Sequence, residues 1–286
     1  MKTVRFCAFA DEAGKDLEAQ VKALKRNGLD LLEIRAVGDK NISDITREEA
    51  KEIKKVLDSE GISVWSLGSP IGKVTLDAAD THIEKFKRLL ESADVFGCTH
   101  MRMFSYKMSP PECTAEAEAR VMENLSKLVD IARGTGVLLC HENEKGIFGY
   151  NAENCEKIHK AFPEIKAVFD TANFVQCGVD TIKAWDILHP YVEYLHSKDA
   201  MDDGLVVPYG EGQGNVRYIV EKYLAQGGEI ITAEPHLFEF KSLKVLETGE
   251  TKTTIGKMFD DADTAFDAGV NAMKKITAEA AKALGA

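Results

Sequence analysis

Short apolar runs alternate with longer amphipathic segments along most of the chain. The runs are rich in β-branched and aromatic residues, which predicts buried parallel strands, and they are Val4–Phe9, Leu31–Arg35, Ser63–Leu67, Thr99–Phe104, Val137–Glu142, Ala167–Asp170, Val192–His196 and Ile230–Glu234. The segments between them carry apolar residues at helical spacing, and are predicted as helices over Asp16–Arg26, Arg47–Asp58, Asp80–Ala93, Thr114–Ala132, Ala152–Ala161, Thr181–Leu188 and Val216–Leu224. Eight strands that alternate with helices predict a closed (β/α)8 TIM barrel with right-handed crossovers.

The pattern changes after the eighth strand. His236–Met258 is longer than an ordinary connection between elements, so we expect a lid over the barrel or a subunit contact. Asp260–Leu284 is rich in alanine and has helical spacing, which predicts a C-terminal helix that closes the barrel. No Pro/Gly/Ser-rich linker divides the 286 residues, and we expect one domain over residues 1–286.

Composition narrows the classes of partner. Lys and Arg number 36 against 47 for Asp and Glu, and the net charge of −11 argues against a nucleic-acid ligand. The N-terminal segment does not resemble a secretion signal, and no segment is apolar enough to span a membrane. The six cysteines lack CxxC spacing, so free thiols in a reducing cytoplasm are expected.

Candidate chemistry gathers at the ends of the last four predicted strands. Glu142, Asp170, His196 and Glu234 each lie at a strand end, and the carboxyl ends of barrel strands meet at one mouth. Three carboxylates crowded there would repel one another unless a cation intervened. Such an oxygen-rich set favours Mn²⁺, Mg²⁺ or Co²⁺, with Zn²⁺ also open. Four separate ion pairs are the alternative interpretation.

Several other side chains are candidate contacts to a substrate, and each has a plainer alternative. Lys198 could donate to a hydroxyl or an oxyanion, or pair with Asp199. Arg102, Lys73 and His236 could bind substrate oxygens, or neutralise acidic neighbours. The glycines of the YGEGQG segment could present N–H groups to an anion or shape a mobile loop, and Trp65 and Phe104 could face a sugar ring or fill the core.

Motifs along nearly the whole chain resemble the xylose-isomerase-like TIM-barrel superfamily. They are FADEAG, LLEIR, LGSPIGK, HEN, FDTAN, HSKD with YGEGQG, and AEPH. The resemblance implies a divalent ion, with Mn²⁺ as the first expectation, bound by Glu142, Asp170, His196 and Glu234. It also implies that Glu142 and Glu234 move protons. Ketose 3-epimerases of the superfamily often have a histidine where this chain has Asn173, a further candidate contact, and a later arginine where it has Lys198.

The resulting hypothesis is a cytoplasmic, metal-dependent isomerase or epimerase of a small sugar, keto sugar or derivative, which acts through an enediolate. The first alternative is a lyase, a dehydratase, decarboxylase or β-eliminating enzyme, on a keto-sugar or keto-inositol. A phosphodiesterase like the apurinic endonucleases fits the acidic chain and its seven histidines poorly. A sugar-binding protein without catalysis is the last alternative, and a homo-oligomer is plausible.

Overall fold

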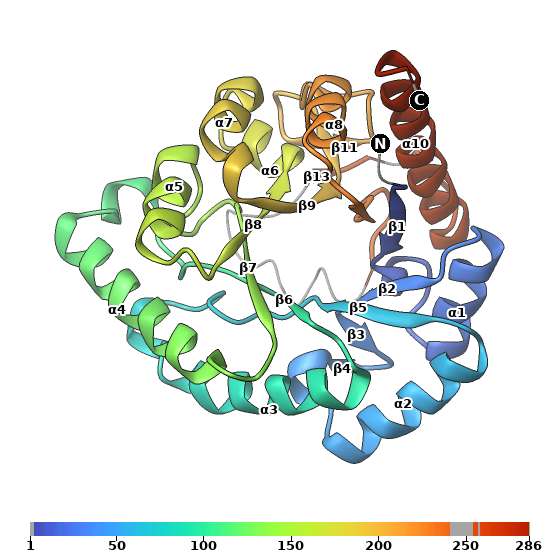
Figure 1. Ribbon diagram of the computed structural model, residues 1–286. Coiled ribbons are helices and arrows are strands. Elements are labelled where there is room, and N and C mark those ends of the chain that lie inside the picture. Colours follow the sequence, from blue (N-terminus) through green and yellow to red (C-terminus); the bar gives the residue numbers. More distant parts are fainter. Residues whose placement is uncertain (1–2, 241–253, 257, 286) are drawn as a thin grey trace.

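Eight parallel strands close into a barrel in the computed structural model, which describes residues 3–240, 254–256 and 258–285 (Figure 1). Around the ring they follow in chain order and β12 returns to β1. Their bounds are β1 Arg5–Ala8, β2 Leu31–Ile34, β5 Ser63–Leu67, β6 His100–Met103, β7 Leu138–Glu142, β8 Lys166–Asp170, β9 Val192–Ser197 and β12 Ile230–Ala233. All eight predicted strands are confirmed, to within one or two residues at most ends.

Helices surround the barrel as predicted (Figure 1). They are α1 Leu17–Arg26, α2 Arg47–Ser59, α3 Thr81–Phe96, α4 Ala115–Ala132, α5 Ala152–Ala161, α6 Thr171–Gln176, α7 Thr181–Leu188, α8 Val216–Ala225 and α10 Ala262–Ala283. Local sequence fixes several of their ends. Thr46 and Glu49 form a reciprocal capping box at the start of α2, and Gly97 adopts the left-handed conformation that ends α3.

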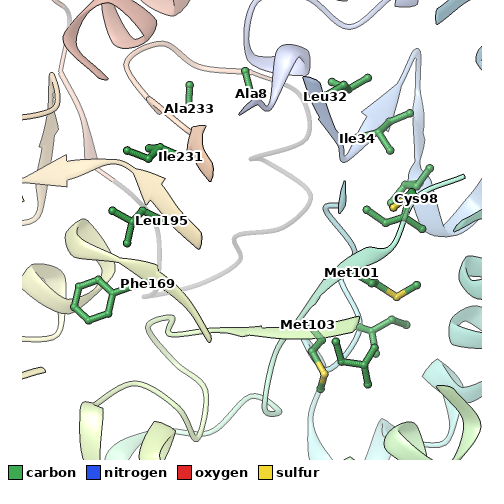
Figure 2. Packing of buried hydrophobic residues seen from close by; sticks show 14 of the residues in the cluster. Ala8, Leu32, Ile34, Cys98, Met101, Met103, Phe169, Leu195, Ile231 and Ala233 are labelled. Carbon is green, nitrogen blue, oxygen red and sulfur yellow. The ribbon is translucent and has the colours of Figure 1, made fainter. Parts of the chain in front are cut away.

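Strand side chains alternate between two layers. The outward layer packs under the helices, and Figure 2 shows Leu32, Met101, Phe169 and Ile231 from four different strands within it. The inward layer is a small apolar cluster of Cys7, Leu31, Cys140, Val168, Tyr194 and Ile230, with Trp65 and Leu138 packed against it. Because strand side chains have a period of two, the next inward positions along each strand reach the barrel mouth.

Two small sheets of short strands lie outside the barrel sheet. β3 (Ala36–Val37) pairs with β4 (Lys40–Asn41), and β11 (Leu205–Val207) lies between β10 (Asp199–Ala200) and β13 (Thr254–Ile255). The predicted long loop, His236–Met258, falls mostly outside the described residues, and its proposed role as a lid or subunit contact stays a prediction. The predicted C-terminal helix is confirmed as α10. All six cysteines are free, and no helix among the described residues is long and apolar enough to cross a membrane.

Candidate metal centre

The four predicted ligands meet at the barrel mouth. Glu142 is the last residue of β7 and Asp170 is the last residue of β8, whereas His196 lies on β9 and Glu234 directly follows β12. Each of the four side chains offers one ligand atom, and these atoms lie within 4.8 Å of one another. All four side chains are buried. The arrangement follows from the fold, because parallel strands of similar length bring their last inward residues to one level. Three carboxylates and one imidazole that converge in this way form a group that fits a divalent cation.

His196 presents one ring nitrogen to this group and the other to the barrel interior. Its Nδ1 lies 3.0 Å from Glu142 Oε1 and 3.2 Å from Glu234 Oε2, whereas its Nε2 lies 3.4 Å from Glu33 Oε2. Burial alone would lower the pKa of His196, but the charges of Glu142, Glu234 and Glu33 raise it well above 6.5. Without a metal ion, an imidazolium partly balances the carboxylates.

The charge balance favours a cation at this site. Eight carboxylates are buried among the described residues, against the side chains of Arg35, Arg102 and Lys198. Two of the eight are compensated separately, because Glu144 pairs with Lys73 and Asp199 accepts backbone N–H groups. When the other six are all ionised and His196 is neutral, as a metal ligand must be, they exceed the three cations by three charges, and a divalent ion would reduce the excess to one.

Two of the predicted ligands have oxygens that no hydrogen bond satisfies. Glu142 Oε2 and Asp170 Oδ2 are buried without a hydrogen-bond partner, although Arg102 and Lys198 lie close by. Burial, together with the charges of Glu142 and Glu234, raises the pKa of Asp170 to about 7 despite the ammonium of Lys198. Buried acceptors of this kind cost free energy unless a donor or a metal ion approaches them. The donor set therefore fits a divalent metal ion.

Two of the predicted substrate contacts lie directly against this group. The Lys198 Nζ atom is 3.0 Å from Asp170 Oδ2 and 3.1 Å from Glu234 Oε2, so its partners are the predicted ligands and not Asp199. Arg102 Nη1 is 3.1 Å from Glu142 Oε2 and 3.4 Å from Glu234 Oε1. Burial would lower the pKa of Lys198, but Asp170 and Glu234 raise it well above 10.5, and the group stays an ammonium.

Arg35 holds the outer side of Glu234. Its guanidinium lies between the rings of Phe9 and Phe240, 4.4 and 4.6 Å from their centroids, and its Nη1 donates to Glu234 Oε1 at 3.0 Å. Two further hydrogen bonds, both 3.0 Å, reach Asp11. Burial would raise the pKa of Glu234, but Lys198 and His196 hold it well below 4.5. Glu234 is thus fixed in place and kept ionised.

His236 lies beside Glu234 in a second acidic group. Its backbone adopts a left-handed φ of 49°, its N–H donates to Glu12 Oε2 at 2.8 Å, and neither ring nitrogen has a hydrogen-bond partner. Glu12, Glu234 and His236 offer ligand atoms near one another. However, Arg35 already contacts both carboxylates, at 3.2 Å from Glu12 and 3.0 Å from Glu234, so its guanidinium compensates this group. Burial raises the pKa of Glu12 to about 8.

The remaining predicted contacts, Lys73 and Asn173, lie at different distances from the centre. Lys73 is 2.9 Å from Glu144 Oε2 and 4.8 Å from the centroid of Phe104, at the rim. Asn173 lies inside, where its Nδ2 donates to Asn143 O at 2.9 Å and to Glu142 Oε1 at 3.3 Å. Phe104 is buried beneath Lys73 and Arg102, whereas Trp65 packs in the barrel interior.

The glycines of YGEGQG bind an anion, but it is a side chain of the protein. The N–H groups of Gly210 and Gly212 donate to Asp199 Oδ2 at 3.1 and 3.0 Å, and that of Gly214 donates to Oδ1 at 2.9 Å. A Cβ on Gly212 would lie 2.5 Å from Asp199 Oδ1, so the close approach requires glycine. The suggested phosphate site on these N–H groups is therefore wrong, since Asp199 occupies them and anchors the segment after Lys198.

Sequence reasoning missed the side chains that hold the ligands in place. Glu33, the acid of LLEIR, lies inside the barrel against His196. Asn143 exchanges two hydrogen bonds of 2.9 Å with the backbone of Asp170. The six-residue helix α6 was also missed. It begins directly after Asp170, whose carboxylate caps it by accepting the N–H of Asn173. Signals for Glu33 and for α6 were present: LLEIR carries an acid near the end of a strand, and FDTAN places an acid, a residue type that caps helices, directly before α6.

Comparison with known proteins supports the same architecture. The family model described as xylose isomerase-like TIM barrel matches residues 21–237, and no curated protein sequence matches the chain. The solved structure of L-ribulose 3-epimerase has a TM-score of 0.76 and 16% identity, and covers 100% of this chain and 97% of its own. The solved structure of IOLI protein with a bound zinc atom has a TM-score of 0.74 and 15% sequence identity, and the match covers 96% of this chain and 99% of that protein.

A dehydratase has the same fold. The probable 3-DHS dehydratase AsbF, involved in petrobactin synthesis, from Bacillus anthracis has a TM-score of 0.72 and 13% identity over 96% of this chain and 99% of its own. At such identities the likeness establishes the fold and leaves the reaction open. The chemistry of this chain must therefore be argued from its own site.

Proposed function

This chain belongs to the xylose isomerase-like TIM barrel family, and from its site we propose that it is a divalent-metal-dependent isomerase or epimerase of a small sugar, keto sugar or sugar derivative. The observation that carries the proposal is the convergence of Glu142, Asp170, His196 and Glu234 at a buried, negatively charged mouth. Mn²⁺ is our first expectation for the ion. A carbohydrate substrate, a cytoplasmic location and a homo-oligomer also remain predictions.

The bound ion would supply Lewis acidity. Glu142, Asp170, His196 and Glu234 would hold the divalent cation, and its charge would make the hydrogen on a carbon next to a substrate carbonyl more acidic. Asp170 serves as an anchor in this scheme, because its backbone is fixed by Asn143 and its other carboxylate oxygen caps α6. His196 is the second anchor, since it lies on β9 within the rigid barrel wall.

Glu142 and Glu234 are the groups that would move the proton. They lie three strands apart around the ring, so they can approach opposite faces of a substrate bound between them. Glu142 is the better placed to take a proton, because Arg102 alone among the buried cations of the described residues lies against its carboxylate. Glu234 accepts hydrogen bonds from Arg35, Arg102 and Lys198, which lower its proton affinity. General acid–base catalysis of this kind contributes roughly 10²–10⁴ in rate.

Lys198 and Arg102 would stabilise the enediolate that forms when the proton leaves. Both are buried cations within 3.4 Å of a carboxylate of the centre, and a substrate oxygen placed there would lie near both charges. Fixed cations at a site without bulk water stabilise a developing oxyanion more than they would in water. Lys73 and His236, at the rim and beside Glu234, remain proposed contacts to substrate hydroxyls.

Isotope exchange tests the proposal. Purified protein loaded with Mn²⁺ is incubated in D₂O with a panel of ketoses, aldoses and keto-sugar derivatives, and the products are analysed by NMR and mass spectrometry. We expect an isomer that carries carbon-bound deuterium, and we expect the Glu142→Gln protein to form it far more slowly. An isomer free of deuterium would reject the proton-transfer mechanism, and failure to convert any compound of the panel would count against isomerisation.

A lyase is the second candidate, and Asn173 is the observation that favours it. Where the related 3-epimerases often carry a histidine, the Asn173 side chain turns toward Glu142 and Asn143 O, and so serves the protein frame. The first step would be the same proton removal, after which water, carbon dioxide or a β-linked group leaves. The isotope experiment separates the two reactions, because loss of mass in the product identifies a lyase.

A further inference from the structure

Glu33 is a fully buried carboxylate to which the proposed reaction gives no task. It lies on β2, on the side of the barrel away from the ligand-bearing strands β7 and β8, and its side chain has no exposed surface. Tyr194 OH donates to its Oε1 at 2.8 Å, and Ser66 Oγ donates to the same oxygen at 3.2 Å. The other oxygen, Oε2, faces His196 Nε2 at 3.4 Å and has no hydrogen-bond partner.

Two irregularities of the barrel wall place the neighbours of Glu33. The register between β2 and β5 shifts between Leu32 and Glu33, which sets Ser66 opposite Glu33. The register between β8 and β9 shifts between Ala167 and Val168, which sets Tyr194 opposite Val168. Bulges that re-aim a side chain are frequent next to active sites. Here they place two hydroxyl groups on one oxygen of Glu33, which leaves the other oxygen turned toward the histidine.

The His196 ring has little freedom of its own. Phe9 and Tyr194 contact it edge to face, with ring centroids 5.3 and 5.4 Å away. Its Nδ1 faces Glu142, Asp170 and Glu234, and Nε2 faces Glu33. A neutral imidazole carries one proton, and a metal ligand must offer the bare nitrogen. If the proton were on Nδ1, the lone pair of Nε2 would face the Glu33 carboxylate, which is repulsive.

We propose that Glu33 is a positioning residue of the metal centre, which holds the Nε2–H proton of His196 so that the Nδ1 lone pair faces the metal ion. The proposal rests on the proposed metal site and extends it inward by one layer. Such partners raise the affinity of a histidine ligand for its metal by fixing the tautomer and the ring. Tyr194 and Ser66 act one step further out, because they hold Glu33.

A purely structural role makes different predictions. In that case Glu33 would only be a buried charge that Tyr194 and Ser66 satisfy, and its removal would change folding stability without changing metal affinity. Glu33→Leu removes the acceptor. Glu33→Gln keeps an oxygen that can accept from Nε2–H, so it should rescue most of the function. Ser66→Ala removes one of the two hydroxyl contacts to Glu33 and leaves that of Tyr194 in place, so its effect should have the same direction as that of Glu33→Leu and be smaller.

The experiment is a titration of the metal-free proteins with Zn²⁺ by calorimetry, together with ¹⁵N NMR of the histidine rings in the Zn²⁺-loaded, labelled proteins. For Glu33→Leu we expect metal affinity to fall roughly 10–100-fold, and for Glu33→Gln less than about tenfold. Ser66→Ala should lose at most about threefold. The NMR spectrum of the wild type should show His196 bound through Nδ1 and protonated at Nε2.

Clear outcomes overturn the proposal. A Glu33→Leu protein that binds Zn²⁺ within about twofold of the wild type would do so, as would coordination of His196 through Nε2. If Glu33→Leu does not fold, Glu33→Met takes its place, because it also removes the carboxylate acceptor but keeps the length of the side chain. Unchanged Zn²⁺ affinity together with an unchanged His196 spectrum in that protein rejects the proposal. Failure of the wild type to bind Zn²⁺ at these residues would instead contradict the metal site itself.

Discussion

Buried histidines lie on both sides of the barrel wall, and their surroundings make them opposites. His196 faces the barrel mouth, where three carboxylates raise its pKa well above 6.5 in spite of burial. His141 precedes the ligand Glu142 but faces outward, where burial lowers its pKa well below 6.5. His159, on α5 beside it, has a pKa of about 4 for the same reason. Burial is the same on both sides, so the neighbouring charges make the difference.

The outer pair has a structural role. His141 Nε2 and Ser105 Oγ are 2.9 Å apart, and Ser105 Oγ also accepts the N–H of Gly149, so these contacts join β7 to the loops above it. His159 Nδ1 lies 3.0 Å from Ile165 O. Among the described residues, neither histidine forms an ion pair or a hydrogen bond with a carboxylate. The inner layer thus collects charge that needs a cation, and the outer layer uses polar groups to tie the frame together.

The largest expected effect is on turnover and belongs to the inner layer. Glu142→Gln and Glu234→Gln each remove a proposed proton carrier, and we expect kcat to fall roughly 10²–10⁴-fold once a substrate is found. The steady-state rate at saturating metal is the measurement. His141→Gln, on the outward face of the same strand as Glu142, is the control and should keep its rate. Equal losses for His141→Gln and Glu142→Gln would erase the distinction between the layers.

The second largest expected effect is on metal affinity, which should fall in variants of the inner layer and stay unchanged in variants of the outer layer. Asp170→Asn removes a charged ligand whose place is fixed by Asn143, and we expect affinity for Mn²⁺ to fall by more than about 100-fold, beyond the effect of losing an outer partner. Calorimetry or an electron paramagnetic resonance titration measures it. The matched variant is His159→Gln, which should bind Mn²⁺ as the wild type does. An Asp170→Asn protein with unchanged affinity would show that the ion binds elsewhere.

Metal binding should also stabilise the fold. An ion at about 100 times its Kd that binds only the native state adds about 2.7 kcal/mol to the free energy of unfolding. For a chain of this size that corresponds to a rise in Tm of about 5 °C or more. Thermal unfolding with and without Mn²⁺ measures the shift. The Asp170→Asn protein, which lacks a ligand, should show little of it, and an equal shift in both proteins would indicate binding to surface carboxylates.

The last expected effect comes from the outer layer and is confined to low pH. The pKa of His159 is about 4 in the folded protein because burial disfavours the charged ring, and it is about 6.5 in the unfolded chain. Between these values the unfolded state binds more protons, so stability falls as pH decreases from about 6.5 to 4, by at most about 1.4 kcal/mol per pH unit. Urea unfolding at several pH values should show a shallower slope for His159→Gln. A slope unchanged by the substitution would contradict a neutral buried His159.

Much of the frame and of the ligand set was predictable from the sequence. Apolar runs such as VLLCHE and IKAVFD carry β-branched and aromatic residues and end in an acid, and this pattern predicts both the strand and the place of Glu142 and Asp170 at the barrel mouth. Lys198 and Arg102 were also expected near the centre, because each lies at or just after the end of a strand. The apolar pattern of each run and the position of the polar residue at its end carry this information, and both are local in the sequence.

The partners of those residues were not predictable, because they depend on contacts across the barrel. Glu33 and Tyr194 are 161 positions apart in the chain and meet through two shifts of register. The YGEGQG glycines have the composition of an anion-binding loop, and only the fold reveals that Asp199 is their anion. Arg35 likewise donates to Glu234, which lies 199 positions away in the chain.

The central claim is that Glu142, Asp170, His196 and Glu234 bind one divalent metal ion. Anomalous diffraction from crystals of the Mn²⁺-loaded protein tests it most directly. We predict one strong anomalous peak at the barrel mouth, bounded by the three carboxylates and His196 Nδ1, with Glu33 against His196 Nε2. A mouth without an anomalous peak, in crystals where Mn²⁺ binds other carboxylates, would contradict the account.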